Sequence, residues 1–94
     1  MNTKQLYWVA DGGHEWLAVP ASLADNVRGI SPYSYISPNG RTAYLEGDLD
    51  AALFLEHYQL AGLPETAFGA TQIFEDDCPV REYPHYHKPE RINR

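Results

Sequence analysis

Cysteine and long apolar runs are nearly absent from this 94-residue chain. The single Cys78 excludes an intrachain disulfide and a cysteine-rich zinc site. No apolar run exceeds five residues, as at positions 51–55, whereas a membrane-spanning helix needs about 20. The N-terminus carries one lysine and no apolar segment, so we expect no secretory signal. These absences favour a protein of the reducing cytoplasm that is stabilised by packing alone.

Basic side chains are scarce in most of the sequence. Residues 1–80 hold three basic and eleven acidic side chains, a net charge of −8, whereas residues 81–94 have a net charge of +2. An acidic body repels the phosphate backbone, so we expect the folded part not to bind nucleic acid. Nucleic-acid binding by the basic tail is a weaker hypothesis, because such tails are more often solvated chain ends.

The length of the chain allows one hydrophobic core. Apolar residues make up 44% and charged residues 21%, an ordinary globular composition. The twelve aromatic residues are the main source of buried area. We therefore expect one domain over residues 1–80, followed by an extended, proline-rich basic arm over residues 81–94.

Two β-hairpins are predicted. Aromatic and β-branched runs at 6–10 and 15–19 flank Asp11-Gly12-Gly13, where glycine permits a tight turn. Both runs are apolar on both faces, which indicates central strands or a second covering segment. A second pair of runs, 33–37 and 42–46, flanks Asn39-Gly40, the strongest short hairpin signal.

Two helices and a last strand complete the expected fold. A short helix is predicted over 22–28, with Ser22 as N-cap and Gly29 after its end. The main helix is expected over about 50–61, with Asp48 or Asp50 at its positive end and glycine 62 after it. With a strand at 70–74, the sequence predicts an α+β fold: a small antiparallel sheet of four or five strands, ordered ββ(α)ββαβ, with one main helix across one face.

The main helix is apolar on two sides. A helical projection places four residues on the core face: Phe54, Leu55, Tyr58 and Ala61. Leu53 and Leu60 fall on the opposite side, beside Glu56 and His57. Because a helix on a sheet needs only one apolar side, another segment or another molecule is expected to cover this pair. A homodimer through the same side is the simplest alternative use.

The expected partner-binding residues combine this helix side with aromatic rings and with the acidic start of the helix. They are Leu53, Leu60, His57, Glu56, Trp8, Trp16, Tyr33, Tyr35, Asp48 and Asp50. Acidic clusters at 46–50 and 75–77 suit a basic docking surface, or they serve only as helix caps and a solvated turn.

Histidines give a competing hypothesis of a metal- or small-ligand-binding domain. In an extended segment, His85 and His87 project to one side, and His14 and Cys78 could complete a tetrahedral site. Asp11 and His14 could also form a general-base pair, although a turn-forming Asp explains the same residues without chemistry. We assign no catalytic residue, and expect no enzymatic activity and no cofactor.

Three sequence patterns, at residues 7–20, 31–35 and 43–51, read YWVxDxGHxWLxVP, SxYSY and AYLExDxDA. Together they resemble small uncharacterised proteins encoded by bacterial phages, prophages and plasmids. The resemblance covers about residues 7–60 and transfers no catalytic residues. It implies an accessory protein of a mobile element in the bacterial cytoplasm. Because the sequence also shows no catalytic constellation, we expect a non-enzymatic protein that occupies a surface of a host or phage protein, as anti-defence inhibitors of the anti-CRISPR type do.

Overall fold

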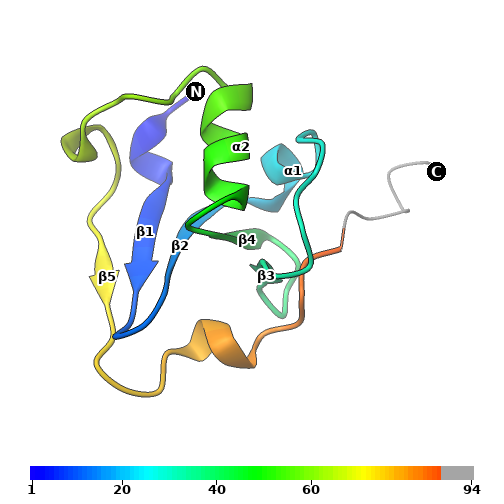
Figure 1. Cartoon of the computed structure of the whole chain (residues 1–94), viewed down its shortest axis with the longest axis vertical. Helices are drawn as coiled ribbons and strands as arrows, with labels where there is room; N and C mark the ends of the chain where they lie inside the picture. The colour runs from blue at the N-terminus through cyan, green and yellow to red at the C-terminus, as the bar shows by residue number, and fades with distance from the viewer. Residues whose placement is uncertain (88–94) are drawn as a thin grey trace.

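A five-stranded sheet forms the centre of the computed structural model, which describes residues 1–87 (Figure 1). The strands are β1 (Tyr7–Ala10), β2 (Glu15–Pro20), β3 (Tyr35–Ile36), β4 (Thr42–Glu46) and β5 (Gln72–Ile73). Their order across the sheet is β3-β4-β2-β1-β5, and only the β1–β5 pair is parallel. The predicted α+β class and the largely antiparallel sheet are confirmed; the parallel β1–β5 pair makes the sheet mixed.

Both predicted hairpins are present. In the β1–β2 turn, the Asp11 carboxylate accepts hydrogen bonds from the backbone N–H groups of Gly13 and His14, at 2.9 and 2.8 Å. In the β3–β4 turn, Gly40 adopts a φ of +74°, a conformation that glycine reaches without strain. Strand β3 has two residues and not five, because residues 33–34 belong to a loop held against the start of the main helix.

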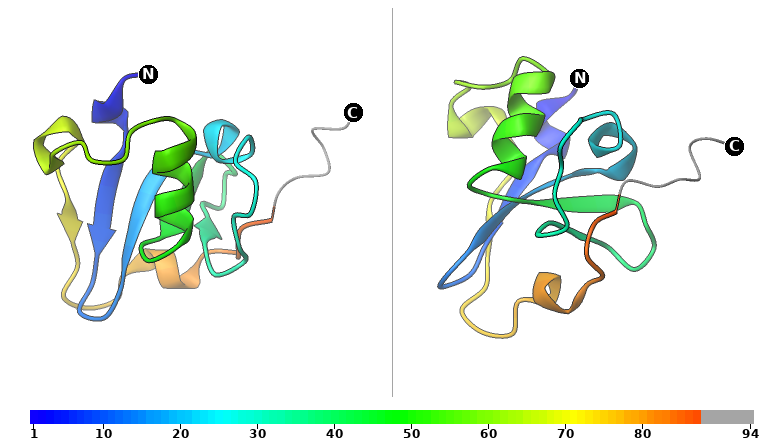
Figure 2. Two further views of the ribbon diagram at one scale, coloured as in Figure 1. Left: turned by 45° about the horizontal axis from the view of Figure 1, so that its top comes forward. Right: turned by 45° about the vertical axis from the view of Figure 1, so that its right-hand side comes forward.

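The central strand β2 is covered on both faces. Leu17 and Val19 pack in the main core beneath the helices, whereas Trp16 and Ala18 pack in a second cluster with Val80. Val80 belongs to η3 (Pro79–Glu82), and Figure 2 shows η3 and the main helix on opposite sides of the sheet. The apolar runs predict a segment that covers the second face of the sheet, and η3 of the same chain is that segment.

The first helix is shorter than predicted, and its predicted cap is wrong. Helix α1 (Ala21–Ala24) is a single turn that follows β2 directly, with Pro20 at its N-cap and no side-chain cap. The Ala21 N–H donates to Arg41 O at 2.8 Å, so helix and sheet join without a linker in which Ser22 could act as cap.

The main helix, α2 (Asp50–His57), also ends before its predicted boundary. Gln59 takes a left-handed φ of +59°, and the Leu60 N–H turns back to Leu55 O at 2.7 Å. The predicted core position Ala61 therefore lies beyond the helix and is exposed. Gly62 has a positive φ of +89°, but it belongs to a later turn.

Leu53 and Leu60 are not a bare side of the helix. Both are half-buried against the main core. The Leu53 Cδ1 lies 3.5 Å from the position of a Cβ built on Gly29, so the segment after α1 covers it. Leu60 follows the end of α2, where a helical projection no longer applies. Of the two covers expected for this pair, another segment of the chain or another molecule, the structure shows the first: the chain itself covers both leucines in part.

The described part of the expected C-terminal arm, residues 81–87, packs on the domain. The Ile36 N–H donates to Pro84 O at 2.9 Å, and the Tyr86 N–H donates to Ser34 O at 2.7 Å. The Tyr86 side chain is 1% exposed in the main core. The rest of the arm, residues 88–94, lies outside the described residues.

Two short 3₁₀ turns, η1 (Thr3–Gln5) and η2 (Glu65–Ala67), precede β1 and β5. Within residues 1–87, no helix has the length and apolar character needed to cross a membrane.

Candidate functional site

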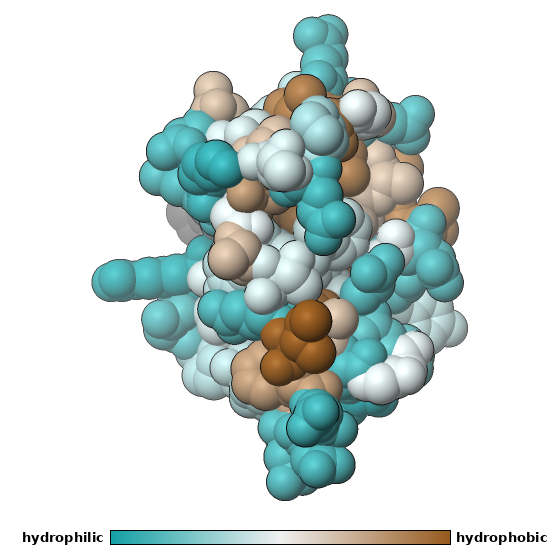
Figure 3. Space-filling view, turned by 90° about the vertical axis from the view of Figure 1, so that its left-hand side faces the viewer, coloured by the Kyte–Doolittle hydropathy of each residue, from teal (hydrophilic) through white to brown (hydrophobic). Residues whose placement is uncertain are grey.

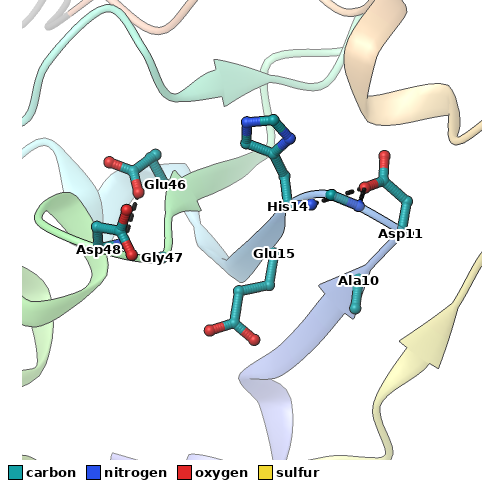
Figure 4. A pocket seen from close by; sticks show the side chains of 8 residues that line it. Ala10, Asp11, His14, Glu15, Glu46, Gly47 and Asp48 are labelled. Atoms are coloured by element: carbon teal, nitrogen blue, oxygen red, sulfur yellow. Dashed lines mark hydrogen bonds between the residues drawn. The ribbon is translucent and has the colours of Figure 1, made fainter.

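A concave site of about 290 Å³ opens beside β2 and β4. We call it the tyrosine pocket; its lining residues are His14, Trp16, Tyr33, Tyr35, Glu46, Asp48 and Arg81. An adjoining pocket of about 300 Å³ shares His14, Glu46 and Asp48 with it (Figure 4). The site thus forms where the β1–β2 turn, the β4–α2 turn and the loop before β3 meet.

Close contact between two turns creates this arrangement. The Gly47 N–H donates to Glu15 O at 3.0 Å, and a Cβ at position 47 would lie 2.7 Å from the Glu15 Cγ. Glycine is therefore needed for the β4–α2 turn to approach the start of β2. Figure 4 shows the result: His14 lies between Asp11 on one side and the Glu46–Asp48 turn on the other.

One wall of the pocket is held by an ion pair. The Arg81 Nε lies 2.5 Å from Asp11 Oδ2, and its Nη2 lies 3.1 Å from Asp11 Oδ1 and 2.7 Å from His14 Nδ1. Because arginine only donates, the His14 Nδ1 accepts this bond. Asp11 bonds the backbone N–H of His14 and not its ring. The structure therefore does not bring the Asp11 carboxylate to the His14 ring, as a general-base pair would require, and the turn-forming role of Asp11 is confirmed.

Stacked rings build the interior of the pocket. The Arg81 guanidinium carbon lies 5.6 Å from the Trp16 ring centroid, and the His14 ring stacks on Trp16 at 6.0 Å. Tyr35 meets Trp16 edge-on at 6.2 Å and stacks on His85 at 5.0 Å. Trp16 is only 2% exposed, so it shapes the pocket without presenting a contact surface.

The rim of the pocket is aromatic and acidic. Tyr33 is 76% exposed. The Glu46 Oε1 accepts the Asp48 N–H at 2.5 Å, which fixes the turn. Among the described residues, the exposed Asp48 carboxylate makes no hydrogen bond or ion pair. Since Asp11 neutralises Arg81, the two carboxylates of Glu46 and Asp48 set the charge of the pocket.

A buried carboxylate holds the rim in place. Asp50 is fully buried, and its Oδ2 accepts bonds from the Ser31 N–H, the Ser31 Oγ and the Ser34 Oγ at 3.1, 2.7 and 2.6 Å. The Ser34 Oγ in turn accepts the Glu46 N–H at 2.9 Å. The sequence predicts Asp50 as a helix cap and as a partner-binding residue. Both predictions are wrong, because the N-cap of α2 is Leu49 and the Asp50 side chain does not reach the surface. Its contacts connect the Tyr33 loop to the Glu46 turn, a role that the sequence analysis missed.

The remaining expected partner-binding residues lie elsewhere. Trp8 and Leu60 line a separate groove of about 360 Å³ with Leu55 and Leu63. Leu53 lies under the segment at residue 29, and Glu56 and His57 are exposed on α2. Trp16, Tyr33, Tyr35 and Asp48 are the four expected residues that the structure brings together.

The structure does not arrange the histidines and Cys78 as the metal-site hypothesis requires. The Cys78 side chain is buried, His14 bonds Arg81, and His85 stacks on Tyr35. In the part of the chain that the structure describes, no group of three or more His, Cys, Asp or Glu side chains is placed to hold a metal ion. His14, His85, His87 and Cys78 therefore do not form such a group.

Compared with protein-family models, curated proteins and solved structures, the chain matches none of them.

The Arg81–Asp11 pair makes stability depend on pH. The Arg81 guanidinium, followed by the Gly13 and His14 N–H groups, holds the pKa of Asp11 well below its usual range. Because the pKa of Asp11 is lower in the folded than in the unfolded protein, its ionised carboxylate stabilises the fold at pH values above the unfolded-state pKa of about 3.9. This contribution is lost as the pH falls through the folded-state pKa. We expect Asp11→Asn, which keeps the turn acceptor, to lower the melting temperature at neutral pH. The difference should shrink as the pH falls below about 4.

Thermal unfolding followed from neutral to strongly acidic pH measures this effect. Asp76→Asn removes an equal charge at an exposed position and serves as the control. A difference between Asp11→Asn and the natural protein that stays constant across this range would contradict the role of the ion pair.

Proposed function

We propose that this chain is a small, non-enzymatic protein that binds a partner protein by accepting a basic side chain in the tyrosine pocket. The observation that carries the proposal is the exposed Tyr33 at a rim that also holds the unpaired carboxylate of Asp48. An exposed tyrosine beside a carboxylate is suited to a guanidinium or an ammonium group, which is attracted by both.

Electrostatics favours a cation in this pocket. Arg81, its own cation, is already paired with Asp11, and Glu46 and Asp48 remain to attract a ligand. The net charge of −6 also steers the protein toward basic surfaces. A partner carboxylate would face the negative charges of both Glu46 and Asp48.

The resemblance to phage and plasmid proteins supports a bacterial host protein or a phage protein as the partner. It likewise supports the cytoplasm of the host cell as the place of action. Inhibition of a defence protein, by occupying a basic surface on it, is one role consistent with this mode of binding.

The proposal is tested with the tripeptide Gly-Arg-Gly, blocked at both ends, as a probe. An aromatic ring at an exposed site contributes about 0.5–1 kcal/mol to binding a cation, and each of the two carboxylates contributes at most about 1 kcal/mol. Because a millimolar dissociation constant corresponds to about 4 kcal/mol, we expect binding no tighter than millimolar. The double variant Glu46→Gln/Asp48→Asn should weaken binding about fivefold, since each exposed charge pair contributes up to about 1 kcal/mol. Tyr33→Ala should also weaken binding, and calorimetry measures all three proteins.

Glu56→Gln is the matched control, because it removes one negative charge from an exposed position on α2, away from the pocket. It should bind the peptide as the natural protein does. Equal binding of Gly-Glu-Gly, or undiminished binding by both pocket variants, would refute the proposal.

A further inference from the structure

The two edges of the sheet differ. On the β3 edge, residues 84–86 of the same chain supply hydrogen bonds to Ile36 and Ser34. On the opposite edge lies β5, where the Ile73 side chain is 75% exposed. Figure 3 looks onto this side of the molecule and shows brown, apolar atoms surrounded by teal ones. The chain therefore covers one edge of its sheet and leaves an apolar residue at the other.

The backbone of β5 is oriented for further pairing. The Phe74 N–H donates to Ala10 O at 2.8 Å, toward β1. Because successive residues of a strand direct their N–H and C=O groups to alternate edges, those of Ile73 point away from β1. An edge strand with such outward groups is a template for another strand.

We propose that β5 pairs antiparallel with β5 of a second copy of this chain, with Ile73 opposite Ile73. Both Ile73 residues direct their N–H and C=O groups outward, so they would exchange two hydrogen bonds across a twofold axis. The two five-stranded sheets would then form one continuous sheet. This proposal is independent of the tyrosine pocket.

Charge favours this antiparallel register. It brings Glu75, in the bend that follows β5, toward Thr71 of the second copy. Lys4 borders this same surface: it lines a concavity with residues 69–71, and its Nζ donates to Thr66 O at 2.6 Å. The acidic turn of one copy would therefore approach Lys4 of the other, whereas a parallel pairing would bring the two acidic turns together. Glu65 lies on the same surface, so the attraction is modest and the backbone bonds provide most of the contact.

Sedimentation equilibrium of the full chain, from micromolar to millimolar concentration, tests the proposal. We expect the average mass to rise with concentration from 10.6 kDa toward twice that value. Ile73→Lys places two like charges across the axis and should raise the dissociation constant about tenfold or more. Ala52→Lys adds the same charge at an exposed position of α2 and should leave it unchanged.

Charge reversal tests the register itself. Lys4→Glu and Glu75→Lys should each weaken the dimer, and the double variant should recover the association of the natural protein. Circular dichroism confirms that each variant is folded. A natural protein that stays monomeric up to millimolar concentration, equal effects of Ile73→Lys and Ala52→Lys, or a double variant weaker than either single one would overturn the proposal.

Discussion

Replacing Tyr86 by alanine is expected to lower the free energy of unfolding by about 3–5 kcal/mol, the usual cost of removing a large aromatic side chain from a core. The ring is 1% exposed in the main core, and its hydroxyl donates to Asp25 Oδ1 at 2.7 Å. Because domains of this size have a total stability of about 5–15 kcal/mol, the variant should lose much of its stability. Urea unfolding followed by tryptophan fluorescence measures the loss.

His87→Ala is the control for this experiment. His87 is the next residue and is exposed, so its removal should change stability by less than about 0.5 kcal/mol. Similar small effects of both substitutions would show that residues 83–87 do not belong to the folded domain.

Asp50→Ala is expected to destabilise the protein by about 2–4 kcal/mol, because it leaves the hydroxyls of Ser31 and Ser34 without their acceptor. It should also abolish binding of the arginine tripeptide, since the Tyr33 loop loses its connection to the Glu46 turn. Denaturant unfolding and calorimetry with the peptide measure the two effects separately.

Asp48→Ala provides a matched control two residues away. Its exposed carboxylate makes no hydrogen bond or ion pair among the described residues, so stability should change by less than about 0.5 kcal/mol while peptide binding weakens. If Asp50→Ala were as stable as Asp48→Ala, the buried network would not hold the rim.

Local signals explain which parts of the fold were predictable. Asn39-Gly40 and Asp11-Gly12-Gly13 specify turns within a few residues, and both hairpins follow them. The end of α2 carries no such signal, because the left-handed residue there is Gln59 and not a glycine. The apolar periodicity therefore predicts a helix that continues to the glycine at position 62, past the observed end at His57.

Long-range contacts explain what the sequence concealed in the site. The sequence predicts Trp16, Tyr33 and Tyr35 as partner-binding residues, and the structure brings all three together in the tyrosine pocket. The burial of Asp50 depends on serines 16 and 19 residues away, and the Arg81–Asp11 pair joins residues 70 apart. A carboxylate at a helix start resembles a cap in sequence. The preceding hydroxyl residues, Ser31 and Ser34, were the available signal that it has buried partners.

Nuclear magnetic resonance of ¹⁵N-labelled protein, titrated with the blocked arginine tripeptide, shows directly whether a basic side chain binds in the tyrosine pocket. We expect the amide signals of His14, Tyr33 and Asp48 to shift and to reach saturation with the arginine tripeptide. The glutamate tripeptide should leave these signals unshifted. Shifts confined to the groove of Trp8 and Leu60, or a weak response spread over the surface without saturation, would contradict a basic side chain binding in the tyrosine pocket.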